Sequence, residues 1–270
     1  MELDVEGRAA YAYTGGKAFD AALPCLVFIH GALNDHSVWT LYARWFAHHG
    51  HAVLALDPPG HGRSDGPPLA SVEALADWLI ALLDAAGVRR AALAGHSMGS
   101  LIALEAAGRA PQRVERLVML GTAVPMKVSD ALMQTSQRDP LKSIDMVNAF
   151  SHASTASKPS YPGPGTWLHG ADRALMRRVQ AGQAQLNLFH HDFGVCDRYA
   201  RGLDAAAQVR CPATLVVGAR DQMTSPKQTA TIAAELNANA PTQVKTVDAG
   251  HAMLAEAPDA VLAALRRAVA

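Results

Sequence analysis

The sequence predicts an α/β fold in which an eight-stranded, mostly parallel sheet is flanked by helices. Short apolar strand patterns alternate with helical patterns along most of the 270-residue chain, as in parallel strands joined by right-handed crossovers. Apolar residues make up 50% of the sequence, so one large core can be buried. The alternation stops over residues 122–206, which carry helical patterns without a convincing strand. This stretch predicts a helical cap inserted after the sixth strand.

Each strand is expected where an apolar run is bounded by turn residues. The first two, at residues 3–5 and 9–13, alternate enough to form an antiparallel hairpin. Apolar runs predict the other six strands, at residues 26–29, 53–56, 91–94, 117–120, 214–217 and 243–247. The core helices are expected at residues 37–48, 72–86, 98–109, 226–237 and 252–268, the second and fourth with Ser71 and Ser225 as N-caps.

Two stretches of the chain, residues 1–121 and 207–270, are expected to form the core, and residues 122–206 the cap or lid. Part of the cap, residues 154–170, is rich in Pro and Gly and cannot hold a regular helix. Residues 161–165 are expected to form a mobile edge that admits substrate. Helical patterns elsewhere in the cap cover residues 130–135, 143–151, 173–183 and 186–199.

The most informative motif is Gly95-His96-Ser97-Met98-Gly99, which lies between a strand pattern and a helix pattern. In a sharp strand-to-helix turn the central serine adopts a sparsely allowed backbone conformation. Glycines two residues to either side let the strand and the helix approach closely. The hydroxyl is then presented above the edge of the sheet. This placement predicts Ser97 as a nucleophile.

A serine hydroxyl is a weak nucleophile near neutral pH, so it needs a base to take its proton and an acid to orient that base. His251 follows the last strand pattern and precedes a helix pattern, which places it on a loop at the sheet edge. Asp221 follows the preceding strand pattern in the same way. Asp248, which comes shortly before His251, is the alternative acid, although its position is also typical of a loop or cap residue.

The Gly-x-Ser-x-Gly motif and the chain order Ser97, Asp221, His251 resemble the α/β-hydrolase family. The resemblance covers almost the whole chain. It implies a serine-nucleophile, esterase-like member of that family with a helical cap.

The resemblance also implies an oxyanion hole built from two backbone amides. In relatives, a His-Gly turn after a strand supplies one of them, and this chain has His30-Gly31 after a strand pattern. By position that amide belongs to Ala32, with Leu33 as the alternative. The residue after the nucleophile, Met98, supplies the second amide. Backbone donors suit this task because they need no reorientation when charge develops on the substrate oxygen.

Apolar residues near these positions are expected to form the substrate pocket. Flexible, polarizable side chains suit an adaptable acyl or alkyl pocket, although methionines more commonly fill the core. The pocket is predicted to include Leu33, Met126, Met223 and Met253.

A metal site is the alternative interpretation of His190-His191-Asp192 with the nearby Cys196. Adjacent histidines on a helix point apart, and no second ligand pair has metal-site spacing. We therefore expect neither a metal nor another cofactor.

Charge and hydropathy argue against several classes of partner. The 24 basic and 24 acidic side chains balance without a basic run, so nucleic acid and anionic membranes are not expected partners. No apolar run reaches the ~18 residues of a membrane span, and the acidic first residues lack the apolar region of a secretory signal. Three well-separated cysteines, Cys25, Cys196 and Cys211, are typical of reduced thiols, so a cytoplasmic location is expected. The oligomeric state is left open, and a homo-oligomer is compatible with the sequence.

The resemblance implies hydrolysis of a small, apolar carboxylic ester, thioester or lactone through an acyl-enzyme. Carbon–carbon bond hydrolysis and cofactor-free perhydrolase or haloperoxidase chemistry would use the same three residues. A non-catalytic ligand-binding member of the fold is the remaining alternative. Ser97 argues against the haloalkane dehalogenase and epoxide hydrolase branches, which have an aspartate at that position. Ala252 disfavours hydroxynitrile lyase chemistry, for which relatives place a lysine there.

Overall fold

The computed structural model describes residues 1–154, 166–183 and 186–270. Within them, eight strands form one sheet in the order β1-β2-β4-β3-β5-β6-β7-β8. β2 pairs antiparallel with β1 and with β4, and all other neighbours are parallel. This architecture confirms the predicted fold class. The strands are β1 (Glu2–Val5), β2 (Arg8–Tyr13), β3 (Cys25–Ile29), β4 (Ala52–Asp57), β5 (Ala91–His96), β6 (Val114–Leu120), β7 (Ala213–Gly218) and β8 (Thr242–Val247).

The central strands are buried on both faces. Every residue of β3, β4 and β5 is buried, as expected when helices cover both sides of a parallel sheet. β8 lies at the edge of the sheet and leaves several of its side chains exposed. Because β3 to β8 all run parallel, their carboxyl ends meet at one edge, where ligands bind in open α/β sheets.

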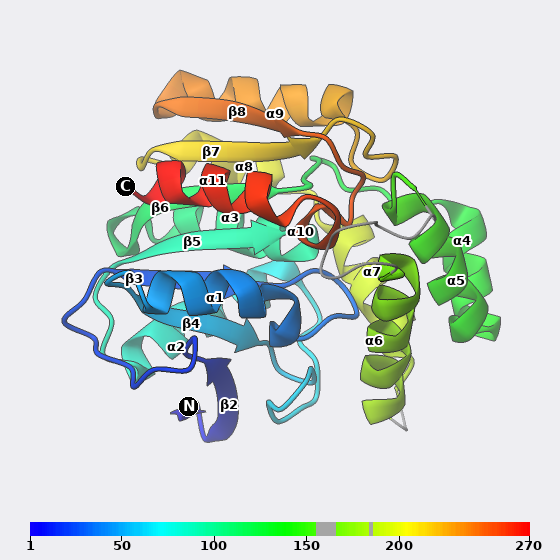
Figure 1. Cartoon of the computed structure of the whole chain (residues 1–270), viewed down its shortest axis with the longest axis horizontal. Coiled ribbons are helices and arrows are strands. Elements are labelled where there is room, and N and C mark those ends of the chain that lie inside the picture. The colour runs from blue at the N-terminus through cyan, green and yellow to red at the C-terminus, as the bar shows by residue number, and fades with distance from the viewer. Residues whose placement is uncertain (155–165, 184–185) are drawn as a thin grey trace.

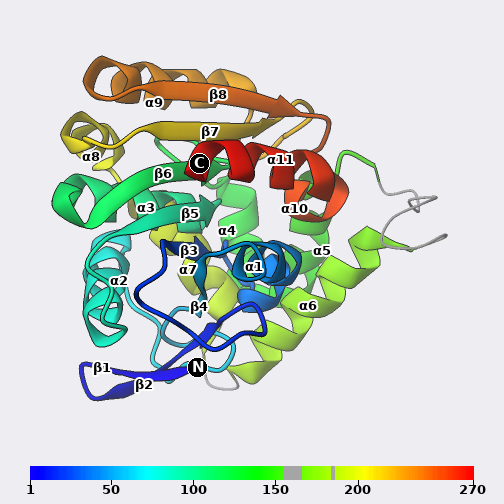
Figure 2. The same ribbon diagram turned by 60° about the vertical axis from the view of Figure 1, so that its left-hand side comes forward.

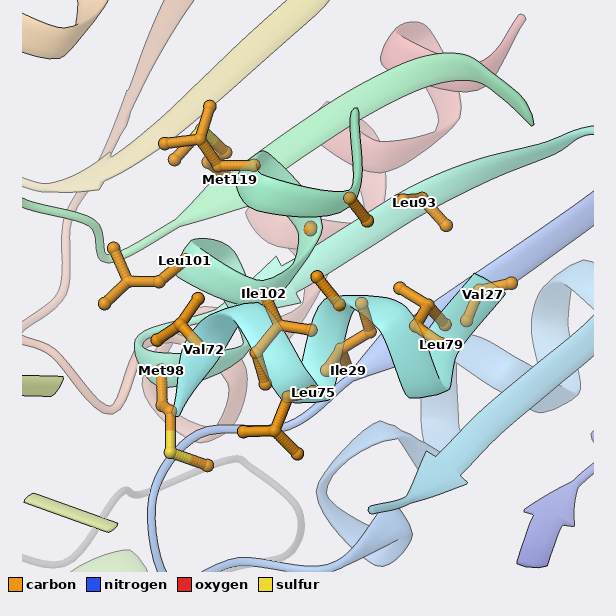
Figure 3. Close-up of a cluster of buried hydrophobic side chains, with 14 of the residues drawn as sticks. Val27, Ile29, Val72, Leu75, Leu79, Leu93, Met98, Leu101, Ile102 and Met119 are labelled. Atoms are coloured by element: carbon orange, nitrogen blue, oxygen red, sulfur yellow. The ribbon is translucent and has the colours of Figure 1, made fainter. Parts of the chain in front are cut away.

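The core helices outside the insertion are η1 (His36–Trp39), α1 (Thr40–Ala47), α2 (Val72–Ala85), α3 (Met98–Arg109), η2 (Pro111–Arg113), α9 (Pro226–Asn239), α10 (Met253–Glu256) and α11 (Pro258–Val269). α1 and α11 lie on one face of the sheet, and α2, α3 and α9 lie on the other (Figures 1 and 2). Each face therefore has its own hydrophobic core. In the core under α2 and α3, Leu75 and Leu79 of α2 meet Ile102 of α3 and Ile29 of β3 (Figure 3).

Pro258 divides the single helix expected over residues 252–268 into α10 and α11. A proline lacks the N–H that a helix interior requires and clashes with the preceding turn, but it is tolerated at the first helical position. It occupies that position in α11, and Ala257 before it leaves the helical region with φ −135° and ψ 53°.

A helical insertion joins β6 to β7. Its first four helices stand beyond the carboxyl ends of the strands (Figure 1). The fifth helix, residues 202–208, was not among the predicted helices, because seven residues give too short a pattern. It crosses the expected boundary between cap and core at residue 207. It packs against the core helices α3 and α9. The predicted lid edge, residues 161–165, lies outside the described residues. The helices are α4 (Asp130–Arg138), α5 (Pro140–Ser151), α6 (Leu168–Gly182), α7 (Leu188–Arg198) and α8 (Gly202–Gln208).

Neither the helices nor the cysteines contradict the expectations from composition. In the described part of the chain, no helix combines the length and the apolar character that a membrane span requires. Cys25, Cys196 and Cys211 are free thiols, and all three are buried in the hydrophobic core that also contains α2 and α3.

Candidate active site

Ser97 lies at the turn from β5 to α3 in a strained backbone conformation. Its φ of 53° and ψ of −120° lie outside the regions that most residues occupy. The flanking glycines make this turn possible. A Cβ on Gly95 would lie 2.1 Å from the Gly99 carbonyl oxygen, and one on Gly99 would lie 2.2 Å from the Ile29 carbonyl oxygen. The Ser97 N–H donates to the carbonyl oxygen of Leu120 at 2.9 Å, which ties the turn to the end of β6.

Asp221 and His251 come together because they follow the neighbouring parallel strands β7 and β8. The Ala219 N–H donates to the Val247 carbonyl oxygen at 2.8 Å, which joins the two loops directly after the strands. His251 Nδ1 then donates to Asp221 Oδ2 at 2.9 Å. Both side chains are buried.

The surroundings of Asp221 keep its carboxylate ionised. Oδ1 accepts the N–H groups of Met223 and Thr224 at 2.8 Å each, and Oδ2 accepts the Thr224 hydroxyl at 2.8 Å. Burial raises the pKa of Asp221, but the charge of His251 and these hydrogen bonds outweigh that effect and lower the pKa to about 2. The carboxylate is therefore charged near neutral pH and orients the imidazole ring.

Asp248, the alternative acid, lies away from the ring of His251. Its side chain is 85% exposed and forms an ion pair with Arg220 Nη2 at 3.0 Å. The structure thus brings Asp221 rather than Asp248 to His251.

His96 holds the His251 loop from the side of the serine turn. Its Nε2–H donates to the His251 carbonyl oxygen at 2.9 Å, and the two ring centroids are 4.9 Å apart. Burial lowers the pKa of His96 to about 3, and the nearby charge of His251 acts in the same direction. His96 is therefore a neutral donor near pH 7. The sequence motif indicates no role for His96, because the partner of its side chain lies 155 residues away in sequence.

A cavity of about 830 Å³ opens beside Ser97 and His251. It combines these two groups with an apolar wall from the insertion, an arrangement typical of sites for small molecules. Asn148, Asp172 and Arg178 add polar groups to that wall. The apolar side chains that the insertion contributes are Val147, Leu168, Leu175, Met176 and Phe193.

The four residues predicted to form the pocket have different locations. Met223 lines the cavity, whereas Leu33, Met126 and Met253 are not among its lining residues. Leu33 and Met253 are fully buried in the core, and Met126 is 8% exposed and packs with other apolar side chains. The side chain of a residue next to a site residue in sequence commonly points away from the site, because successive side chains in a turn or helix point in different directions. The predicted pocket therefore needs correction at these three positions.

The two candidate amides of the oxyanion hole differ in what they already bind. The Leu33 N–H donates to Asp192 Oδ2 at 2.8 Å, so it is occupied. Ala32 lines the cavity, and its N–H donates no hydrogen bond to any of the described residues. Met98 is the first residue of α3, where N–H groups have no partner within the helix. The geometry therefore favours Ala32 and Met98.

The residues of the alternative metal motif on α7 point to separate partners. His190 Nδ1 is 2.8 Å from Ser136 Oγ, and His191 Nε2 donates to the Leu69 carbonyl oxygen at 2.9 Å. Asp192 contacts the turn described above. Within the described residues, no group of three or more His, Cys, Asp or Glu side chains is arranged to hold a metal ion.

The sequence did not predict the contacts of two buried acids near the site, although it singled out Asp192 as a residue of the alternative metal motif. Asp192 binds the Leu33 turn, and Glu256 accepts the N–H of Gly250 at 2.7 Å. The Glu256 carboxylate also accepts the N–H of Ala153 from the insertion at 3.0 Å. The sequence signal for such a contact is an acidic residue in an otherwise apolar stretch. This signal is weak, because the fold decides whether the residue is buried.

Comparison with known proteins gives both a family and a fold. A model of the alpha/beta hydrolase family matches residues 26–264. The dihydrolipoyllysine-residue acetyltransferase component of the acetoin cleaving system from Pseudomonas putida is 32% identical over 164 residues, which cover 58% of this chain and 44% of that protein. The chain thus matches less than half the length of that relative.

Two solved structures resemble the whole chain. The enol-lactonase from Burkholderia xenovorans LB400 has a TM-score of 0.82 at 20% identity and covers 99% of this chain and 98% of its own. An esterase from Exiguobacterium antarcticum has a TM-score of 0.82 at 16% identity, with coverage of 100% and 98%. At such low identity these structures show the fold alone. The family match, in contrast, extends from β3 into α11, and the chain therefore belongs to the alpha/beta hydrolase family.

Proposed function

We propose that the protein hydrolyses small carboxylic esters or lactones, thioesters included, with Ser97 as nucleophile, His251 as general base and Asp221 as the acid that orients it. The observation that carries this proposal is the buried hydrogen bond of 2.9 Å between His251 Nδ1 and Asp221 Oδ2. His251 lines the same cavity as Ser97, whose backbone is strained. Asp221 occupies Nδ1 of the ring, which leaves Nε2 to take the serine proton.

The reaction proceeds in two halves. Ser97 Oγ attacks the carbonyl carbon while His251 Nε2 takes the hydroxyl proton. The tetrahedral oxyanion accepts hydrogen bonds from the N–H groups of Ala32 and Met98. The ester C–O bond then breaks, and His251 passes its proton to the leaving alcohol. Water attacks the acyl-enzyme by the same route, which releases the carboxylic acid and returns the proton to Ser97.

The insertion is proposed to act as a cap that selects the substrate. Helices α5, α6 and α7 supply apolar side chains to the lining of the cavity that also contains Ser97, so a small, mostly apolar acyl or alkyl group fits this wall best. The two similar structures, an enol-lactonase and an esterase, support a reaction at an ester or lactone carbonyl. We assign the cap role to α4–α7, because α8 packs against core helices.

The test is hydrolysis of p-nitrophenyl esters of increasing acyl length, combined with labelling by a fluorophosphonate. The wild type should release nitrophenol and be labelled at Ser97 in a one-to-one ratio. Ser97→Ala should lose the label and about 10⁴-fold in kcat, because removal of one triad member leaves only the residual rate from the oxyanion hole and binding. The fold should be unchanged, since one partly exposed hydroxyl contributes little to packing.

Two results would contradict the proposal. Undiminished hydrolysis by Ser97→Ala would show that another group is the nucleophile. A wild type that binds ester analogues but shows neither turnover nor labelling would favour a non-catalytic binding protein.

A further inference from the structure

Asp192 is a buried carboxylate that the proposed reaction does not use. It lies on α7 in the insertion and is 1% exposed. Its Oδ2 accepts the Leu33 N–H at 2.8 Å and the Nε2–H of His61 at 2.8 Å. One oxygen atom thus joins three segments that are distant in sequence: α7, the turn after β3, and the loop after β4.

The turn that Asp192 holds is strained. Leu33 has a φ of 54°, in the left-handed region that side chains other than glycine rarely adopt. Such a conformation persists only where the surroundings enforce it. A hydrogen bond to a charged acceptor is about twice as strong as one between neutral groups, so the carboxylate is well suited to hold this peptide.

The Leu33 N–H belongs to the peptide that links Ala32 to Leu33. Ala32, whose own N–H is the proposed oxyanion donor beside the cavity, directly precedes Leu33 in this turn. If the strained φ of Leu33 relaxed, the turn that carries this N–H would change shape. Oxyanion stabilisation depends strongly on the direction in which the donor points. Asp192 is therefore placed to hold the turn of the donor, although it is not among the residues that line the cavity.

His61 makes this arrangement possible in the interior. A buried carboxylate without a partner would be strongly unfavourable, and His61 provides a countercharge. The His61 ring is in turn held by a second contact, because its Nδ1 lies 3.2 Å from the Pro59 carbonyl oxygen. Burial raises the pKa of Asp192, but the charge of His61 and the two hydrogen bonds outweigh this and keep its pKa below the usual range.

We propose that Asp192 is a positioning residue of the insertion that fixes the Ala32–Leu33 turn in the conformation needed for oxyanion stabilisation. This inference rests on the proposed function. It gives the insertion a part in the chemical step as well as in substrate choice.

The test measures kcat for ester hydrolysis by Asp192→Ala and by the wild type. Each kcat is divided by the number of active sites, counted by complete labelling of Ser97 with a fluorophosphonate. We expect kcat to fall at least about tenfold while KM changes less than about threefold, since complete removal of one oxyanion donor costs about 10²- to 10³-fold in kcat. The inhibition constant of a trifluoromethyl ketone, whose adduct carries an oxyanion, should rise by the same factor as kcat/KM falls.

Asp197→Ala is the matched control, because Asp197 is on the same helix and its carboxylate accepts the Val128 N–H at 3.1 Å, away from the oxyanion turn. It should retain kcat per labelled site. Replacing the Leu33 peptide N–H by an ester oxygen is the second variant. It removes the Leu33 hydrogen bond and leaves the buried Asp192–His61 pair intact, so it remains informative if Asp192→Ala does not fold.

The outcomes separate this inference from the proposed function. If Ser97→Ala is inactive while Asp192→Ala or the Leu33 ester keeps full kcat per labelled site and loses only stability, Asp192 is structural, and the inference is overturned although the proposed function stands. If the wild type does not hydrolyse esters at all, the proposed function fails and this inference fails with it.

Discussion

At the scale of single residues, the orientation of the His251 ring depends on one carboxylate. Asp221→Asn replaces an acceptor that is charged near neutral pH by an amide whose NH₂ group can face Nδ1. The ring then loses the tautomer that leaves Nε2 free to accept a proton, and it loses the stabilisation of its charged form. We expect kcat/KM for a short acyl ester to fall by about 10³- to 10⁴-fold.

Asp248→Asn is the control for this prediction, since it makes the same chemical change at an exposed position shortly before His251. It should alter kcat/KM less than about twofold, as expected for an exposed ion pair that contributes little. If Asp248→Asn is the more damaging change, Asp221 is not the orienting acid.

The pH dependence of hydrolysis follows from the charge states of the same groups. A protonated imidazole cannot accept the serine proton, so kcat/KM should rise as the pH increases from about 5 to 8, where histidine loses its charge. The pKa values of Asp221, about 2, and of His96, about 3, place both groups in one charge state throughout this range. Neither of these two groups therefore causes the rise. A flat profile of kcat/KM over this range would be incompatible with a histidine base.

The positions of the candidate residues Ser97 and His251 after strands could be predicted from local patterns alone. Ser97 stands in a glycine-flanked turn, and His251 follows a strand pattern directly, so local sequence carries the signal. Asp192 and His96 could not be assigned in this way. Their roles depend on partners 159 and 155 residues away, and such contacts exist only after the chain has folded.

At the scale of elements, the strand and core helix positions followed from hydrophobic periodicity, whereas helix ends and the pocket did not. Pro258 is a visible sequence signal for the break between α10 and α11, and the prediction of one helix over residues 252–268 did not use it. Side chains on α5, α6 and α7 form the part of the cavity lining that the insertion supplies. Their directions depend on how these helices pack over the sheet edge, and no periodicity within one helix shows that.

Met176 on α6 provides the sharpest test of the cap role. It lines the cavity and is 8% exposed. Met176→Ala removes the side chain beyond Cβ and enlarges the acyl-binding wall. Each methylene buried in an apolar pocket contributes about 0.8 kcal/mol, or roughly fourfold in kcat/KM. The preferred acyl length in a p-nitrophenyl ester series should therefore shift toward longer chains.

Met126→Ala is the matched control for Met176→Ala. Met126 is equally buried, at 8% exposed, and belongs to the same stretch of chain between β6 and β7, but it does not line the cavity. It should lower stability without changing the order of preference among acyl chains. If the two variants give the same chain-length profile as the wild type, α6 does not determine specificity.

At the scale of the whole molecule, the insertion is hydrogen-bonded to two segments of the proposed site, the Ala32–Leu33 turn and the His251 loop. Asp192 reaches the oxyanion turn on one side. On the other, the end of α5 reaches the base loop, where the Ala252 N–H donates to the Ser151 carbonyl oxygen at 2.8 Å. Through these two connections, we expect a displacement of the insertion to shift both the proposed oxyanion donor and the proposed base.

Glu256 adds a further contact between the insertion and the His251 loop, and its substitution tests this coupling. Its carboxylate accepts the N–H of Gly250, next to His251, at 2.7 Å, and the N–H of Ala153, at the end of α5, at 3.0 Å. Glu256→Gln leaves one acceptor oxygen for two donors, the buried Gly250 N–H and the partly buried Ala153 N–H. The free energy of unfolding should drop by about 1–3 kcal/mol, as for a buried donor left without a partner. Amide hydrogen exchange should become faster at both Gly250 and Ala153, and kcat for ester hydrolysis should fall because the base loop is less well fixed.

Asp259→Asn is the control for Glu256→Gln, because it neutralises an exposed acid in the first turn of α11. Among the described hydrogen bonds and ion pairs, Asp259 has no contact with the loop that carries His251. It should leave both exchange rates and kcat unchanged. The decisive comparison is between the two amides in Glu256→Gln. If Ala153 exchanges faster while Gly250 keeps its protection and kcat is retained, the insertion and the base loop are held independently, and Glu256 does not couple them. If both amides and kcat respond together, the buried carboxylate transmits the position of the insertion to the catalytic base.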